Sequence, residues 1–213
     1  MAERAESRKN HRLTNPVDRL TRNLPSPWAT IVDWVVTIAV AVLAVLAIKQ
    51  WVVNPYRIPT SSMEPTLHCA QPQPGCEASY SDRVLANRFI YHFRQPERGD
   101  IVVFETPPAV ARSCDGGGDV FVKRLIGLPG DRIAERNGDV FVNGRRLDEP
   151  YIGNGNRDSS SGGPWEVGPD EYFFMGDNRA SSCDSREWGP VPRENLIGPV
   201  FAVYWPPQRI GFR

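Results

Sequence analysis

The sequence predicts a mainly β protein in which an antiparallel sheet domain follows one N-terminal transmembrane helix. Short runs of strand-forming residues recur between turn residues from position 83 onward. The 20 Pro and 18 Gly favour many turns over long helices. A continuous apolar stretch precedes these runs, and 213 residues suffice for one ordinary domain plus such an anchor.

Residues 1–27 are predicted to form a basic cytoplasmic tail. Its charges are Arg4, Arg8, Lys9, Arg12, Arg19 and Arg22 against Glu3, Glu6 and Asp18, a net charge of +3. Because Asp33 and Lys49 cancel and the whole chain has a formal net charge of 0, the remainder is weakly acidic, about −3. Nucleic-acid binding needs clustered cations, so this charge argues against nucleic acid as a partner.

Residues 28–53 are predicted to form the transmembrane anchor. The segment from Trp34 to Ile48 carries no charge, and 26 residues of helix are about 39 Å long, enough to span a bilayer with some tilt. Trp28, Trp34 and Trp51 lie near the two ends, where indoles prefer the headgroup region. A buried core helix and a cleaved secretory signal are the alternatives. The apolar run starts late and no small-x-small site follows it, which favours an uncleaved anchor.

The four cysteines fit a location outside the cytoplasm. Cys69 and Cys76 bracket a short Pro/Gly loop that is typical of a local disulfide. Cys114 and Cys183 would form the second pair, although three pairings are possible. Free thiols remain an alternative, and a zinc site is disfavoured because there is no C-x-x-C pair and histidine is scarce.

Residues 54–213 are predicted to form the outer, β-rich domain. Its expected strands are 83–85, 100–104, 120–126, 139–142 and 171–175. Asn137-Gly138 and Asn143-Gly144 flank D-V-F-V and predict two tight hairpins. The D-S-S-S-G-G segment from Asp158 to Gly163 is interpreted as a surface loop.

Serine–lysine chemistry is the most specific functional prediction. A serine hydroxyl needs a base to act as a nucleophile, and the only histidines, His11, His68 and His92, lie in contexts that predict surface residues. A Ser-Lys pair is the recognised substitute. Lys123 suits the role because it lies in the apolar run V-F-V-K-R-L-I-G-L, where burial can lower its pKa. A solvated lysine at a strand edge is the alternative. Arg124 should point to the opposite face of the strand.

Five local patterns carry a resemblance to a known family. In chain order they are P-T-S-S-M-E-P-T-L from Pro59, S-D-R-V-L-A-N-R-F from Ser81, R-G-D-I-V-V-F from Arg98, V-K-R-L-I-G-L-P-G-D from Val122 and M-G-D-N-R-A-S-S-C-D-S-R-E-W-G from Met175. Following an N-terminal anchor in this order, they resemble the conserved boxes of bacterial type I signal peptidases. The resemblance implies a β-sheet catalytic domain of the signal-peptidase type. It also implies a membrane-bound serine endopeptidase that removes N-terminal signal peptides from exported preproteins.

The resemblance also implies individual roles. Ser62 would be the nucleophile and Lys123 the general base. Thr60 would supply a hydroxyl to the oxyanion hole beside the main-chain N–H of Ser62. Ser182 would hydrogen-bond and orient the lysine. An ion pair between Asp184 and Arg186 would brace the site.

Substrate preference follows from the same resemblance. Family members cut after small residues at positions −1 and −3. Apolar residues would shape the two pockets, with Ile58, Pro59, Met63, Phe121 and Val122 at position −1 and Tyr56, Ile58 and Val122 at position −3. The substrate would add as a β-strand to residues 56–60 and 120–123. Alternatively, each of these is an ordinary core residue.

Two positions depart from the family pattern. Ala180 stands where many members have Asp, and Cys183 replaces a small residue beside Asp184. The expected partners are signal peptides, the lipid bilayer and, by proximity, the export translocon, and no cofactor or metal ion is expected.

The sequence leaves two alternative functions. One is a self-cleaving repressor-type protease, and the other is an inactive, membrane-anchored β domain that binds secreted proteins.

Overall fold

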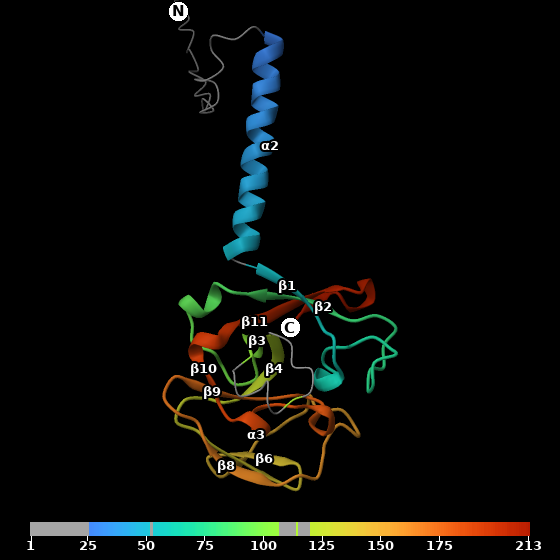
Figure 1. Ribbon diagram of the computed structural model, residues 1–213, viewed down its shortest axis with the longest axis vertical. Helices are drawn as coiled ribbons and strands as arrows, with labels where there is room; N and C mark the ends of the chain where they lie inside the picture. The colour runs from blue at the N-terminus through green and yellow to red at the C-terminus, as the bar shows by residue number, and fades with distance from the viewer. Residues whose placement is uncertain (1–25, 52, 107–113, 115–119) are drawn as a thin grey trace, which may run out of the picture. The chain divides into compact units, whose positions relative to one another are not determined.

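The computed structural model describes residues 26–51, 53–106, 114 and 120–213 (Figure 1). Side chains in 26–29 and 47–51 lie outside this description. The basic tail predicted for residues 1–27 falls almost entirely outside it. The chain divides into two units, residues 1–48 and 49–213, and each is considered by itself.

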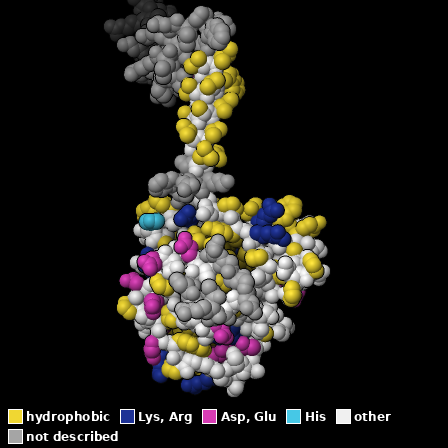
Figure 2. All heavy atoms as spheres, viewed as in Figure 1, with side chains coloured by type: hydrophobic (Ala, Val, Ile, Leu, Met, Phe, Trp, Pro, Cys, Tyr) yellow, Lys and Arg dark blue, Asp and Glu magenta, His cyan; other side chains and the backbone are white. Residues whose placement is uncertain are grey.

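The described residues of the first unit all belong to helix α2, which runs from Ser26 to Trp51. Its described apolar side chains are exposed, for example Trp34 at 64% and Leu43 at 65%, and they cover the helix surface (Figure 2). Within the part of the chain that the structure describes, no helix is both long and apolar enough to cross a membrane. The transmembrane anchor therefore stays a prediction.

The second unit is built from two antiparallel sheets. The larger sheet has the order β1-β2-β11-β3-β4-β9-β10, with β12 paired to β11, and the smaller has the order β7-β6-β5-β8. The larger sheet consists of β1 (Val53–Arg57), β2 (Arg83–Asn87), β3 (Ile101–Glu105), β4 (Val120–Gly127), β9 (Glu171–Met175), β10 (Val191–Pro192), β11 (Leu196–Trp205) and β12 (Gly211–Phe212). The smaller consists of β5 (Arg132–Arg136), β6 (Asp139–Val142), β7 (Arg145–Arg146) and β8 (Gly162–Glu166).

Short helical turns connect several strands. They are η1 (Ser61–Met63), η2 (Ile90–His92), η4 (Arg179–Ser181), α3 (Ser185–Trp188), η5 (Arg193–Asn195) and η6 (Pro207–Arg209).

The two sheets confirm the prediction of a mainly antiparallel β domain. The five expected strands are present within a residue or two of their expected ends.

Both predicted hairpins are present in the smaller sheet. Asn137 and Gly138 have φ values of 50° and 78°, and Asn143 and Gly144 have φ values of 51° and 80°. This is the left-handed backbone that a two-residue hairpin with the correct twist requires. The expected surface loop 158–163 is shorter than predicted. Gly162 already pairs with β5, and the Ser160 hydroxyl donates to Glu135.

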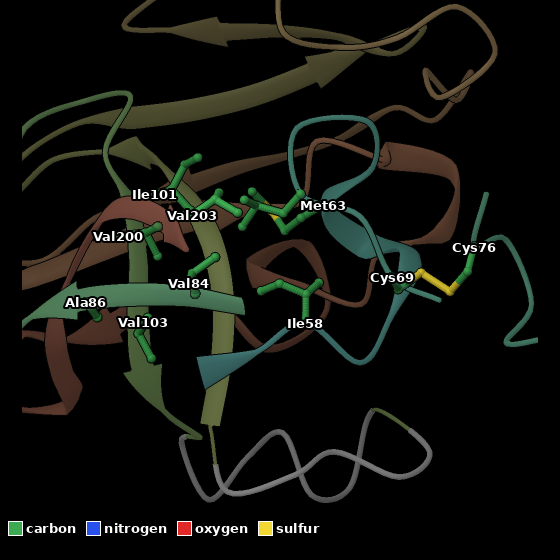
Figure 3. Packing of buried hydrophobic residues seen from close by; sticks show 11 residues of the cluster. Ile58, Met63, Cys69, Cys76, Val84, Ala86, Ile101, Val103, Val200 and Val203 are labelled. Carbon is green, nitrogen blue, oxygen red and sulfur yellow. A yellow bond between two sulfur atoms is a disulfide. The ribbon is translucent and has the colours of Figure 1, made fainter. Parts of the chain in front are cut away.

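Three apolar clusters hold the second unit together. One packs β1, η1 and β2 against β3 and β11, with Ile58, Met63, Val84, Val103 and Val200 among its members (Figure 3). A second centres on Phe104, Leu125 and Phe174. The third joins the C-terminal half of β4 and β9 to the smaller sheet. Strand β4 contributes to all three clusters, so its side chains are held firmly on both faces.

The structure forms both predicted disulfides. Cys69 is bonded to Cys76 (Figure 3) and Cys114 to Cys183. All four cysteines are therefore oxidised, which leaves no thiolate to bind zinc.

Candidate active site

Ser62 lies in the turn η1, which follows β1. The turn closes with a hydrogen bond from Glu64 N–H to Ser61 C=O of 3.0 Å, and Leu67 N–H donates to Met63 C=O over 2.9 Å. Met63 and Leu67 are buried at 1% and 0% exposure and anchor the turn in the first apolar cluster. Ser62 is consequently held in place while 8% of its surface stays accessible.

The hydroxyl of Thr60 lies beside that of Ser62. Thr60 precedes η1 with an extended backbone, and its side chain does not cap the turn. Its Oγ1 is instead 3.3 Å from Ser62 Oγ. A second hydroxyl is thereby placed next to the candidate nucleophile.

Lys123 lies on β4 and is almost fully buried, at 1% exposure. Burial among apolar side chains lowers its pKa from 10.5 to about 8. Asp184 raises this pKa, Arg186 lowers it and Asp177 raises it. The Nζ atom lies 5.6 Å from the centre of the Phe121 ring. The solvated lysine that the sequence left as an alternative is therefore ruled out.

The serine turn and the lysine strand are brought together by the segment after β9. Turn η1 packs against both β4 and η4. Asn178 N–H donates to Ser62 C=O over 3.1 Å, and Asn178 Nδ2 donates to Ser61 C=O over 3.2 Å. The segment 176–186 also carries the charges that act on Lys123. A serine and a low-pKa lysine are thus assembled around one segment.

Gly176 allows the closest approach within this assembly. A Cβ atom there would lie 2.2 Å from Ser182 Oγ and 2.4 Å from the Ser62 carbonyl oxygen. Contacts under 3.0 Å are not tolerated, so a side chain would push either Ser182 or the Ser62 turn away. Glycine is required here because three segments meet without space between them.

The hydrogen bond expected between the hydroxyl of Ser182 and Lys123 is not formed. Ser182 Oγ is buried and has no hydrogen-bond partner within residues 26–51, 53–106, 114 and 120–213. The hydroxyl is positioned by its extended backbone and by packing against Gly176. The missing hydrogen bond could not be predicted from the sequence, because the orientation of a hydroxyl depends on the surrounding packing.

The ion pair expected between Asp184 and Arg186 is present. Arg186 Nε donates to Asp184 Oδ1 over 2.9 Å, and Asp184 also accepts from Gly176 N–H over 3.0 Å. Arg186 further donates to Asp158 over 2.7 Å and to Arg179 C=O over 2.9 Å. The surrounding carboxylates raise the pKa of the Arg186 guanidinium despite its burial. This pair braces the segment that surrounds Lys123.

Arg124 points away from Lys123, as strand alternation predicted. Its guanidinium donates twice to Asp177, over 2.8 and 2.7 Å, and once to Gly99 C=O over 2.9 Å. Asp177 also accepts from the hydroxyl of Thr66. Asp177 is fully buried, so this bidentate pair ties β4 to the loop after β9.

The predicted pocket residues fall into two groups. Ile58, Met63, Val122 and Tyr56 pack together in the first apolar cluster, and Ile58 and Met63 are seen there in Figure 3. Pro59 is exposed. Phe121 lies instead in the second cluster, with its ring 5.4 Å from that of Trp188. Alternation along β4 separates Phe121 from its neighbour Val122.

Comparison with known proteins identifies the family of this chain. The family described as signal peptidase, peptidase S26, matches residues 31–205. A probable signal peptidase I-2 from Synechocystis sp. is 42% identical over 175 residues, 82% of this chain and 73% of that protein. The chain belongs to the signal peptidase family.

Two further signal peptidases support the assignment. Signal peptidase I from Leptolyngbya laminosa is 35% identical over 187 residues, 88% of this chain and 86% of that protein. Signal peptidase I P from Bacillus subtilis subsp. natto is 34% identical over 191 residues, 85% of this chain and 93% of that protein. As a signal peptidase the chain is a serine endopeptidase, which favours this function over the two alternatives.

Some residues of this signal peptidase site were not singled out from the sequence. Asn178 holds the Ser62 turn, and Gly176 permits the close contact just described. Glu64 is 1% exposed and accepts from the Cys69 N–H over 3.0 Å and contacts His68 Nδ1. His68 was expected at the surface and is instead partly buried by this contact. Their position in the sequence could have pointed to them, since each of these residues belongs to one of the five quoted patterns or directly follows one.

Proposed function

We propose that this signal peptidase cleaves signal peptides from exported preproteins with a dyad of Ser62 and Lys123. The observation that carries the proposal is the burial of Lys123, which lowers its pKa to about 8 beside a buried serine turn. A lysine with an ordinary pKa would be protonated at neutral pH and could not accept a proton. No histidine is needed in this mechanism.

The reaction proceeds through an acyl-enzyme. Neutral Lys123 Nζ accepts the proton of Ser62 Oγ as that oxygen bonds to the scissile carbonyl carbon. The oxyanion formed is stabilised by the main-chain N–H of Ser62 and by the hydroxyl of Thr60. Protonated Lys123 gives the proton to the leaving amine as the C–N bond breaks. Lys123 then takes a proton from the water that attacks the ester carbon, and returns it to Ser62 Oγ as the C–O bond breaks.

The preprotein would bind as an added strand along β4. Residues Val120–Lys123 pair with β3, whereas pairing with β9 begins only at Arg124. Leu125 N–H donates toward β3, to Asp100 C=O. By the alternation of an antiparallel ladder, the N–H and C=O of Val122 face the other edge, where no described strand pairs with them. Main-chain groups at this edge can bind an extended peptide of any sequence.

Side-chain packing would supply the preference for small residues at positions −1 and −3. Ile58 and Met63 are buried members of an apolar cluster against which Val122 and Tyr56 pack. Walls of this kind reject larger side chains because overpacking a dense interior is costly. Exposed Pro59 would border the −1 pocket. We assign Phe121 to the apolar surroundings of Lys123 rather than to the −1 pocket, because its ring faces the Nζ atom of Lys123.

We further propose that residues 28–53 anchor the enzyme in the cell membrane as a single span. The exposed apolar side chains along α2 support this anchor, since exposing an apolar surface of this length to water is unfavourable. Residues 1–27, with their net charge of +3, would remain in the cytoplasm. Residues 54–213 would then lie on the outer side, near the translocon that delivers preproteins. Both disulfides suit that oxidising side.

The function is tested with the full chain in detergent and one radiolabelled preprotein. The wild type should release the signal peptide at a bond that follows small residues at −1 and −3. Ser62→Ala should be inactive, and Lys123→Arg should be as inactive as Lys123→Ala, because arginine keeps its proton in a protein. Substantial cleavage by Lys123→Arg would show that the general-base assignment is wrong.

A further inference from the structure

The disulfide between Cys114 and Cys183 lies within the catalytic segment. Cys183 separates Ser182 from Asp184, in the stretch between η4 and α3. Cys114 comes from the connection between β3 and β4, and the two Cα atoms are 6.1 Å apart. The bond therefore ties Cys114 to the segment that packs against the Ser62 turn. A small residue at position 183 would make no such tie.

One neighbour of Cys183, Asp184, acts electrostatically on Lys123. Asp184 is fully buried, accepts from Gly176 N–H and pairs with Arg186. The charged groups that act on Lys123 are Asp184, Arg186 and Asp177. A displacement of residues 182–184 would move one of these charges, Asp184, and admit water to a lysine whose low pKa depends first on burial.

Ser182 depends most on this restraint. Its hydroxyl has no hydrogen-bond partner among the described residues, and its carbonyl accepts only a long bond of 3.5 Å from Arg186. The backbone at Ser182 is extended and is not part of a helix or a strand ladder. Its position is therefore set by the main chain on either side and by packing against Gly176, and the disulfide is the covalent restraint at the next residue.

We propose that the Cys114–Cys183 disulfide is a positioning crosslink of the active site, so that turnover depends on the redox state of this pair. The inference rests on the proposed dyad. Reduction by a dithiol breaks the S–S bond and yields two thiols, with the two electrons and two protons supplied by the dithiol, which becomes a disulfide. Cys114 and Cys183 are each only partly buried, so a reductant can reach them.

The second disulfide provides the matched control. Cys69 and Cys76 lie 7 positions apart in the sequence and belong to the first apolar cluster, which does not include residues 182–184. In a Cys69→Ser/Cys76→Ser background, the Cys114–Cys183 bond is the only disulfide, so any effect of a reductant on the folded enzyme is assigned to it. Cleavage of the preprotein is measured with and without dithiothreitol at several pH values, and circular dichroism monitors folding.

Reduction should lower kcat about tenfold near pH 7 with little change in KM, and reoxidation should restore it. A tenfold loss corresponds to an increase of about one unit in the pKa of Lys123, because each unit reduces the neutral fraction of the lysine about tenfold. The pH–rate profile should therefore shift by about one unit to higher pH. A crosslink that only stabilised the fold would leave this profile in place. Cys114→Ser/Cys183→Ser in the otherwise native chain should show the same shift.

Two results would overturn the proposal. One is an unchanged pH profile and kcat for the folded, reduced enzyme. The other is wild-type behaviour of Cys114→Ser/Cys183→Ser when it is folded. Failure of the dyad itself gives a different result, namely cleavage by Ser62→Ala equal to that by the wild type, so the two hypotheses are separated by the same assay.

Discussion

Replacement of Lys123 by methionine should abolish cleavage and at the same time stabilise the fold. The side chain is 1% exposed, so the folded protein carries it either as a poorly solvated ammonium or as a neutral amine. Either form costs free energy relative to the solvated, charged lysine of the unfolded chain. Methionine has a similar length and no charge, and fits an apolar site without that cost.

The magnitude follows from the pKa. Lys123 changes from 10.5 to about 8 on folding, and about 2.5 units at 1.36 kcal/mol each is about 3 kcal/mol. Below pH 8 both states are protonated and the full cost is present. Between pH 8 and 10.5 the unfolded chain keeps a proton that the folded chain has lost, so wild-type stability rises with pH. The advantage of Lys123→Met should therefore be about 3 kcal/mol at pH 7 and fall below about 1 kcal/mol at pH 10.

Thermal unfolding of the full chain in detergent, followed by circular dichroism at pH 7 and pH 10, measures this difference. About 3 kcal/mol corresponds to an increase in Tm of roughly 6–12 °C for a domain of this size. Arg145→Met is the matched control, because Arg145 is exposed and an arginine stays charged over this range. An equal Tm difference for Lys123→Met at both pH values would refute the reasoning, since it would show that packing rather than charge burial separates the two proteins.

Three further predictions concern the site. Because the pKa of Lys123 in the free enzyme is about 8, kcat/KM should rise about tenfold per pH unit up to that pH and then level off, and a profile centred near pH 6 would point to histidine instead. Thr60→Ser should remain active, whereas Thr60→Val should lose about 10²–10³ in kcat with little change in KM; equal kcat values would remove Thr60 from the oxyanion site. Gly176→Ala should stay folded by circular dichroism and lose at least about tenfold in kcat, because the added Cβ overlaps Ser182 and the Ser62 carbonyl. Wild-type kcat in that variant would show that these contacts can relax.

Local features of the sequence were sufficient for much of the architecture. The two Asn-Gly hairpins were predictable because only a few residues adopt the left-handed backbone that such turns require. The position of Lys123 on a buried strand followed from the apolar residues around it, and the opposite orientation of Arg124 followed from the two-residue period of a strand. These predictions rest on interactions between residues close together in the chain.

The meeting of Ser62 with the segment after β9 was decided by tertiary structure. Asn178 and Ser61, which share a hydrogen bond, lie 117 residues apart, and Thr66 and Asp177 lie 111 apart. Such contacts depend on the order of strands in the larger sheet, where β11 separates β2 from β3. A local pattern carries no information on that order.

The sequence by itself determined the strand and hairpin pattern and, by resemblance, predicted the residues of the dyad, but it left the cysteine pairing open until the structure paired Cys69 with Cys76 and Cys114 with Cys183. Only the tertiary structure decided that Ser182 lacks its expected hydrogen bond, that Phe121 lies in a different cluster from Met63, and that Gly176 has no room for a side chain. The physical reason is that pKa, pocket shape and hydroxyl orientation depend on distances of a few ångströms between segments remote in sequence. Those distances are set by packing of the whole domain, which the properties of neighbouring residues do not specify.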